Sequence, residues 1–398
     1  MQHWIIEPYD PLIVRDGRPF GPHPGARART LPFPFPSTIA GGLRTRAGED
    51  GNGIFDPDQI PRVKGITVRG PLLVELDPSG NAEAMLPAPR DALFLQDNET
   101  REVTRHRLQP LQVPAGADGD LPPDLAYPVG LARPDLRKPF KDAPDYWHWS
   151  RFEEWLFKPP VLKALDSKEM AGLGHAGPGA DRRVHVALDP QTFSGIDGGL
   201  FATGGLSFVR ESKAESLHSV RRLALAVSAD NLDGLAIEEG FAPLGGERRI
   251  MSWQKSADIF PKTPGKVIEE IVKTGFCRLI LLTPAVFDQG WQPGWLLQPR
   301  HGLQPRLKAA LTGKPQTISG WDFEQKGPKK TRRLVPAGSV YFLELGGQES
   351  SRREWAEAVS MQNISDEEVD RKSGFGLAIL GTWSGQAVEI AEEVTKDA

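Results

Sequence analysis

The sequence predicts an α+β protein built from two copies of one unit that meet near residue 250. Two observations support this prediction. An apolar strand containing a proline, followed by a turn with aspartate and glycine, occurs at 10–17 and again at 284–290. Each half also ends in a glycine cluster followed by a tryptophan, Trp253 in the first half and Trp383 in the second. Features repeated in the same order are expected when a unit has been duplicated.

Length and composition agree with two globular units. The chain has 398 residues, more than one ordinary domain needs. Hydrophobic residues make up 39% and charged residues 25%, which provides enough apolar material for a folded core. The 42 glycines and 36 prolines follow no strict repeat, so they predict many turns and long ordered loops rather than a bundle of long helices.

Charge and cysteine content limit the possible functions. The net charge is −4, so any nucleic-acid-binding surface must gather its positive charge locally. The single cysteine, Cys277, lies in an apolar stretch and excludes an intrachain disulfide and a cysteine-rich zinc site. Neither a signal peptide nor an apolar run of the roughly 20 residues that a membrane helix needs is found. These features predict a cytoplasmic protein.

Local patterns predict the elements in order. Residues 4–14 form a strand, and Gly17 can adopt positive φ in the turn that follows. The proline-rich segment 22–36 is extended, and Ser37 or Thr38 then caps a short helix. An aromatic-rich helix is expected over 146–157 and a hairpin tip over 192–199, with strands at 63–76, 93–95, 184–188, 200–209, 220–227, 276–287 and 340–343.

No motif assembles a catalytic centre. Gly313-Lys314 is followed by Pro315, which blocks the helix start that a phosphate-binding P-loop needs. His-Glu-x-x-His and Cys-x-x-Cys are both missing from the sequence. The acidic run 366–368 has the spacing of a solvated helix face. The sequence therefore predicts no catalytic residue, no metal and no cofactor.

The glycine-rich segment 372–383 is a candidate RNA-binding loop. Its glycines let the main chain approach a phosphate closely, and backbone amides can donate to it. Lys372, Gly374 and Gly376 are the candidate contacts there. The alternative is a tight turn packed against a helix, which the glycines alone favour.

Five basic clusters lie near glycine turns or strand ends, an unexpected number in an acidic protein. Lysine and arginine directed at the RNA backbone give sequence-tolerant, salt-sensitive affinity. The clusters are Arg15 with Arg18; Arg44 with Arg46; Arg182 and Arg183 with His185; Arg248 with Arg249; and Lys326, Lys329, Lys330, Arg332 and Arg333.

An ordered set of segments resembles one family, the third subunit of the type III-B CRISPR Cmr complex. The resemblance covers nearly the whole chain except about 100–170, which we expect to be a family-variable insertion. The segments that carry it are 8–20, 36–44, 183–189, 199–201, 244–249, 335–342 and 374–376.

This resemblance implies membership of the RAMP superfamily, with two tandem ferredoxin-like (RAMP/RRM-like) domains and long loop insertions. The expected domains are 1–250, with the variable insertion, and 251–398, ending in the glycine-rich loop. It also implies a non-catalytic subunit for antiviral defence that binds the 5′ tag of CRISPR RNA. The implied protein partners are the large polymerase-like subunit and a backbone RAMP subunit. Carried over by position, the implied RNA contacts are Arg15, Arg18, Arg44, Arg182, Arg183, His185, Arg248, Arg249, Gly374 and Gly376, whereas Lys329, Lys330, Arg332 and Arg333 are added from charge alone.

Two other functions are compatible with the sequence. The first is a metal-independent RAMP endoribonuclease, in which His185 or His23 would act as the general base and lysine or arginine would stabilise the phosphorane. The second is a carbohydrate- or protein-binding module, suggested only by the ten tryptophans and the abundant glycine and proline.

Overall fold

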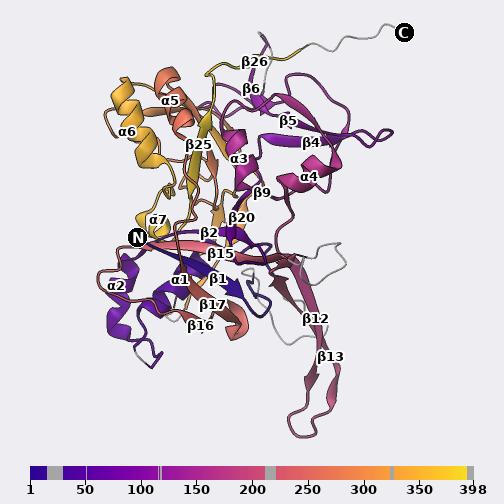
Figure 1. The fold of residues 1–398 in the computed structure, drawn as a ribbon, viewed down its shortest axis with the longest axis vertical. Coiled ribbons are helices and arrows are strands. Elements are labelled where there is room, and N and C mark those ends of the chain that lie inside the picture. Colours follow the sequence, from indigo (N-terminus) through magenta and orange to yellow (C-terminus); the bar gives the residue numbers. More distant parts are fainter. Residues whose placement is uncertain are drawn as a thin grey trace.

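The structure is a computed structural model and describes residues 1–15, 30–50, 52–114, 116, 119–210, 221–322 and 327–391. It is a mixed α+β protein in which strands predominate and two main antiparallel sheets form the body (Figure 1). A long hairpin projects from one end of this body, away from the helices α5 (Gly265–Thr274) and α6 (Glu349–Val359) (Figure 1). In the part of the chain that is described, no helix is both long and apolar enough to cross a membrane.

The first sheet is built mainly from the first half of the chain. Its central strands are β2 (Thr67–Leu76), β15 (Arg221–Asp230), β1 (Gln2–Pro8) and β17 (Ile250–Ser256), neighbours in that order and antiparallel throughout. The sheet is extended at its edges by β3 (Ala82–Pro87), β9 (Tyr146–His148), β11 (Gly174–His175), β14 (Val209–Arg210) and β16 (Gly240–Pro243).

The second sheet lies in the second half and repeats the strand order of the first. It runs β19 (Pro305–Leu311), β24 (Val340–Leu345), β18 (Phe276–Leu281) and β25 (Ala378–Thr382), again antiparallel. Among the four central strands of the first sheet, and among the four strands of the second, the second in sequence lies beside the third, the third beside the first, and the first beside the fourth. This shared order is what a duplicated unit would produce, while the domain boundaries themselves stay a prediction.

Two predictions about helices, the cap of the first helix and the extent of the aromatic-rich helix, are wrong in part. The first helix begins at Pro36, with Phe35 at its N-cap and no side-chain cap, because proline occupies the first turn where Ser37 or Thr38 was expected to cap. The aromatic segment begins as strand β9, and only its later part, from Trp149, is helical. The helices are α1 (Pro36–Ala47), α2 (Ile60–Gly65), α3 (Trp149–Leu156), α4 (Ser167–Leu173), α5, α6 and α7 (Glu368–Lys372), with 3-10 turns at Pro57–Gln59 and Gly246–Arg248.

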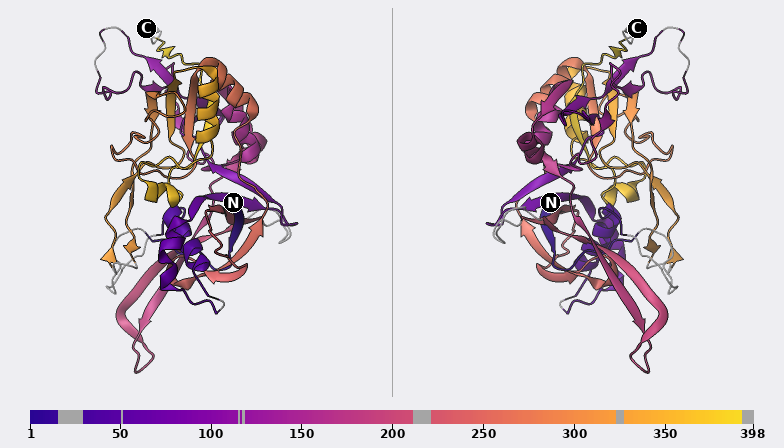
Figure 2. Two further views of the ribbon diagram at one scale, coloured as in Figure 1. Left: turned by 90° about the vertical axis from the view of Figure 1, so that its left-hand side faces the viewer. Right: turned by 90° about the vertical axis from the view of Figure 1, so that its right-hand side faces the viewer.

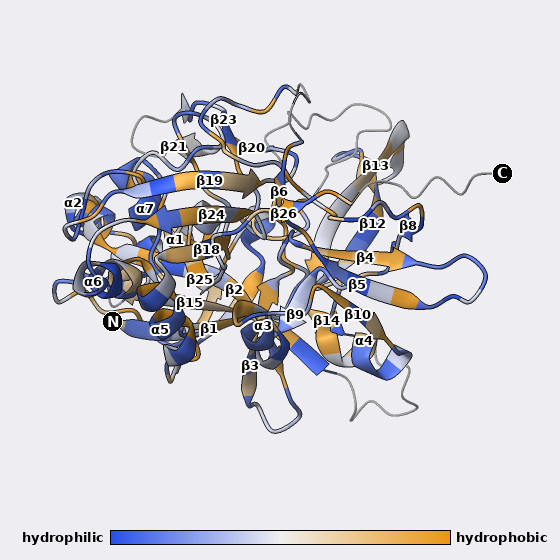
Figure 3. Cartoon of the chain, turned by 90° about the horizontal axis from the view of Figure 1, so that it is seen from above, coloured by the Kyte–Doolittle hydropathy of each residue, from blue (hydrophilic) through white to orange (hydrophobic). Residues whose placement is uncertain are grey.

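The first sheet is buried on both faces. Along β15, Leu223, Leu225 and Val227 pack into the core that contains α1, whereas Ala224 and Ala226 face the core shared with α3 and the second half. This alternation follows from the two-residue period of a strand. Figure 3 shows the corresponding hydrophobic stretches along the central strands of the molecule. The two halves are therefore joined by one continuous apolar core.

The predicted insertion folds into small sheets packed against the second half. One sheet has the order β10 (Leu162–Leu165), β5 (Val103–Arg107), β4 (Ala92–Gln96) and β8 (Lys138–Pro139). A second contains β6 (Gln109–Gln112), β7 (Val129–Gly130) and β26 (Val388–Glu389), so the end of the described chain pairs with the insertion.

The predicted hairpin is confirmed and is longer than expected. Its strands are β12 (Gly179–Leu188) and β13 (Gly195–Ser207), paired from Gly179 with Ser207 to Leu188 with Gly195. Figure 2 shows it extending well beyond the body of the molecule. On the same side lie the short strands β20 (Gln316–Ile318), β21 (Trp321–Asp322), β22 (Gly327–Pro328) and β23 (Arg332–Leu334).

Candidate nucleic-acid interface

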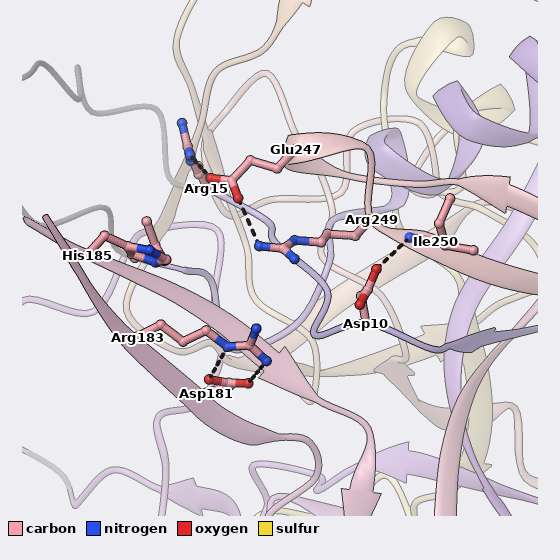
Figure 4. Close-up of polar contacts among 9 residues, drawn as sticks. Asp10, Arg15, Asp181, Arg183, His185, Glu247, Arg249 and Ile250 are labelled. Carbon is pink, nitrogen blue, oxygen red and sulfur yellow. Dashed lines mark hydrogen bonds and ion pairs between the residues drawn. The ribbon is translucent and has the colours of Figure 1, made fainter. Parts of the chain in front are cut away.

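Basic side chains from three distant segments converge at the base of the hairpin (Figure 4). Arg15 follows β1, Arg183 lies on β12, and Arg249 lies at the start of β17. Glu247 connects two of these segments, since its carboxylate lies 2.7 Å from Arg15 Nη2 and 3.0 Å from Arg249 Nη2. We call this set of arginines, together with Arg248, the hairpin-base cluster.

The glycine pair before β17 brings these segments together. Gly245 has a φ of +75°, and a Cβ there would lie 2.5 Å from the carbonyl oxygen of Ile13. Only glycine allows this close approach without strain. The Gly246 amide then donates to the same Ile13 carbonyl at 2.7 Å, which fixes the loop beside the segment that carries Arg15. The glycines thus position the arginines, and the arginines present the charge.

The hairpin-base cluster holds excess positive charge at the surface. Its four arginines are accompanied by the carboxylates of Asp181, Glu247 and Asp10 (Figure 4). Arg183 is exposed, and hydrogen bonding to Asp181 followed by the charges of Asp181 and Asp10 raises its pKa. Arg248 is also exposed and has a φ of +50°. Arg15, Arg183 and Arg248 are exposed, so a phosphate could reach their guanidiniums.

An aromatic pair lies on the same face of the hairpin as Arg183. The His185 ring stacks on Phe201 with centroids 5.2 Å apart and 19° between the planes. His185 Nε2 also lies 2.9 Å from Thr203 Oγ1. Side chains alternate along a strand, so Arg182 projects on the opposite face with Val184 and Val186. The two faces of the hairpin therefore differ in chemistry.

Three predicted contacts instead occupy the junction between the halves. Arg44 donates to Ser373 Oγ at 3.2 Å and to the Lys372 carbonyl at 3.0 Å, and burial lowers its pKa. Gly374 and Gly376 are buried. A Cβ at Gly374 would lie 2.6 Å from the Gly70 carbonyl oxygen of β2. We assign these three residues to packing, and Lys372 to an ion pair of 2.8 Å with Glu368.

The basic residues around β23 also fall into two groups, one engaged in contacts within the fold and one exposed to solvent. Arg332 donates to both carboxylate oxygens of Asp370 at 2.6 Å, and that carboxylate is 3% exposed. Arg332 thus anchors β23 to α7. Lys329, Lys330 and Arg333 are exposed, and Figure 2 shows this region on the same side of the molecule as the hairpin. They form a second exposed basic patch.

Some predicted residues lie outside the described part of the chain, namely Arg18, His23 and Lys326. The acidic partners Asp181 and Glu247 and the ring of Phe201 were not predicted from the sequence. The alternation of the hairpin strands is the signal that would have placed Phe201 opposite His185. Within the described ranges no group of three or more metal-ligating side chains is found.

Two antiparallel sheets whose central strands share one order, together with a projecting hairpin, make this a mixed α+β protein with two main sheets. The model of one protein family, described as CRISPR-associated protein (Cas_Cmr3), matches residues 4–383. The chain belongs to this family, which is the family of the third subunit of the type III-B Cmr complex that its segments resemble. The family membership that the sequence resemblance predicted is confirmed.

Solved structures show more distant likenesses. A chain in the cryo-EM structure of the type III-B Cmr-beta bound to cognate target RNA is 16% identical, with a TM-score of 0.45, covering 85% of this chain and 86% of that one. A chain of the Csm3-Csm4 subcomplex of the type III-A CRISPR-Cas interference complex is 9% identical, with a TM-score of 0.36, covering 86% and 92%. None of the curated proteins compared with the chain matches it.

Proposed function

We propose that this type III-B CRISPR effector subunit is a non-catalytic, RNA-gripping protein that holds the 5′ tag of CRISPR RNA at the hairpin-base cluster. The observation that carries the proposal is the convergence of arginines from three segments on one exposed surface, beside the stacked His185–Phe201 pair. Arginine matches phosphate in bidentate geometry, and an aromatic face can stack on a base. The exposed patch of Lys329, Lys330 and Arg333 extends the positive surface on the same side.

The binding test uses the double variant Arg248→Ala with Arg249→Ala. We expect its Kd for a tagged CRISPR RNA to rise at least tenfold, because two guanidiniums directed at phosphates are lost. The slope of log Kd against log salt should also become shallower by about one for each contact removed. Fluorescence anisotropy over a salt series measures both quantities.

The matched control removes two exposed lysines from the insertion, Lys141→Ala with Lys168→Ala. The same net charge is lost, yet the Kd should change less than threefold. Wild-type binding that does not depend on salt, or an equal loss in both double variants, would refute the arginine surface as the RNA site.

The endoribonuclease alternative is not supported by the histidines that the structure describes. His185 is engaged with Thr203 and stacked on Phe201. The rings of His148 and His175 do lie 6.3 Å apart. However, His148 Nδ1 lies 3.2 Å from a carboxylate oxygen of Glu83 and His175 Nε2 lies 3.3 Å from one of Glu75, and the two histidine side chains are only 13% and 9% exposed. In the binding assay with EDTA, we therefore expect the tagged RNA to stay intact, and cleavage lost in His185→Ala would overturn the non-catalytic assignment.

Two ferredoxin-like domains are part of the same proposal. The central strand order that recurs in the two sheets supports this assignment. Each sheet also has a helix between two of its strands: α1 between β1 and β2 in the first, and α6 between β24 and β25 in the second. We also propose that the protein docks to the large polymerase-like subunit and to a backbone RAMP subunit. The family membership supports both partners, and the hairpin offers a surface for the second.

The apolar face of the hairpin is the surface that we assign to the backbone subunit. Val184, Val186, Leu188 and Leu200 are 67%, 45%, 54% and 60% exposed, and the register places them on one face of the two strands. An exposed apolar surface on a projecting element is typical of a protein-binding site.

The docking test replaces Val184, Val186 and Leu200 with serine. Co-purification with the backbone subunit should fall at least tenfold, while RNA binding by the isolated protein should be retained because Arg183 lies on the other face. The triple substitution Lys141→Ser, Lys163→Ser and Lys168→Ser, on the exposed surface of the insertion, is the control. Full co-purification of the hairpin variant would exclude this face from the interface.

A further inference from the structure

A small pocket lined by both charged and apolar residues lies at the opposite end of the molecule from the hairpin, between the insertion and the second half. Its volume is about 230 Å³, below the roughly 300–1,000 Å³ of pockets that hold drug-sized ligands. Figure 1 shows elements that contribute to it, β5, β6, α5 and β25, in the upper part of the view. The residues that matter for its chemistry are Asp91, Arg107, Gln109, Lys158, Arg278 and Ser384.

The pocket contains two guanidiniums, those of Arg107 and Arg278, but the carboxylate of Asp91 pairs with only one of them. Arg278 and Asp91 form an ion pair with side chains 2% and 0% exposed. The second oxygen of Asp91 accepts from Trp155 Nε1 at 2.9 Å, so both carboxylate oxygens are occupied. At the rim, Lys158 is neutralised by Glu270 at 2.9 Å. The charge of Arg107 is therefore the one left without a balancing carboxylate among these groups.

Arg107 is held in this position without a charged partner. It donates from Nη2 to the neutral Oε1 of Gln109 at 2.8 Å, and its Nε is buried with no hydrogen-bond partner. Within the described part of the chain, Arg107 makes no ion pair with a carboxylate within 4.0 Å. Burial first, and the charge of Arg278 second, lower its pKa to about 10. A cation is thus kept in a half-buried pocket at an electrostatic cost.

We infer that this pocket binds a phosphoryl anion, with the Arg107 guanidinium as its main ligand. A guanidinium presents paired N–H donors that match the oxygens of a phosphate, and an added anion supplies the missing negative charge. The Ser384 hydroxyl and the Lys158 ammonium line the same pocket and offer further donors. Its small volume fits one phosphoryl group. The site is separate from the hairpin-base cluster and does not depend on the function proposed for it.

A bound anion would also join two parts of the chain, because residues of both line the pocket. Arg107 and Gln109 belong to the insertion, whereas Arg278 and Ser384 belong to the second half. An anion bound between them would hold the two parts together. Because a ligand that binds only the folded state stabilises it, phosphate should raise the melting temperature of the protein.

The test compares the full-length wild-type protein with Arg107→Gln and with the control Lys141→Gln, an exposed cation of the same insertion. Melting temperature and calorimetric binding are measured with inorganic phosphate, AMP and acetate at constant ionic strength. The wild type and Lys141→Gln should bind phosphate in a saturable one-to-one manner, and Arg107→Gln should bind at least tenfold more weakly. Without phosphate, Arg107→Gln should melt no lower than the wild type, because an unbalanced buried charge is removed.

Each result distinguishes the anion site from a structural arginine. Tighter binding of AMP than of phosphate would support recognition of a nucleotide phosphate, and equal binding would support a free phosphate site. Stronger binding of acetate than of phosphate would overturn the proposal in favour of a carboxylate pocket. Equal phosphate binding by wild type and Arg107→Gln, or a lower melting temperature of Arg107→Gln in phosphate-free buffer together with no phosphate effect on the wild type, would also overturn it.

Discussion

Replacing Asp91 with alanine is expected to lower the free energy of unfolding by about 3–5 kcal/mol, because the buried guanidinium of Arg278 then loses its carboxylate. Neither side chain has appreciable access to solvent. Arg278 also donates to the Trp155 carbonyl, and the Trp155 indole donates to Asp91, so the network joins β18, the residue before β4, and α3 of the insertion. Urea unfolding followed by tryptophan fluorescence measures the loss.

Two further variants separate the ion pair from general effects of the substitution. Asp142→Ala removes an exposed carboxylate from the same insertion and should change stability by less than about 0.5 kcal/mol. The double variant Asp91→Leu with Arg278→Met should recover most of the loss, since apolar residues of similar volume often replace a buried pair without penalty. A loss below about 1 kcal/mol in Asp91→Ala would show that the pair does not hold the insertion in place.

Locally determined features could be predicted from the sequence. The hairpin was predictable because the alternation of Val184 and Val186 and the turn residues between the strands are both short-range signals. The buried Cys277 was predictable because its neighbours in β18 are apolar. Its neighbour Arg278 is a charged residue inside the same apolar strand. That position is a sequence signal for a buried ion pair, which was not predicted.

Features that depend on distant partners could not be predicted. Tyr146–His148 is a strand because it pairs with β3, which its aromatic composition does not encode. Arg44 appeared to be a surface cation on a helix, yet its partner Ser373 lies 329 residues further along the chain. Arg332 likewise turns to Asp370. Basic residues were visible in the sequence, but only the fold decides which of them face solvent.

Gly374, in the loop 372–383 that the sequence offers as a candidate RNA-binding loop, is expected to be one of the least replaceable residues of the chain. Gly374→Ala should destabilise the protein by about 2–4 kcal/mol, the combined cost of a left-handed backbone for an alanine and of overpacking. Its φ is +92°, and the new Cβ would lie 2.6 Å from the Gly70 carbonyl oxygen, a backbone atom that cannot move aside alone. Thermal unfolding measures the effect.

The same glycine-to-alanine substitution at Gly41 provides a control in which the expected change in stability has the opposite sign. Gly41 is exposed within α1, and a Cβ there would meet nothing within 4 Å. Gly41→Ala should therefore stabilise the protein by about 0.5–1 kcal/mol, because alanine is the better helix former. If Gly374→Ala folded with wild-type stability but lost RNA affinity, the loop would be an RNA contact. Loss of stability with unchanged affinity in the folded fraction would instead establish that the closing glycines join the two halves.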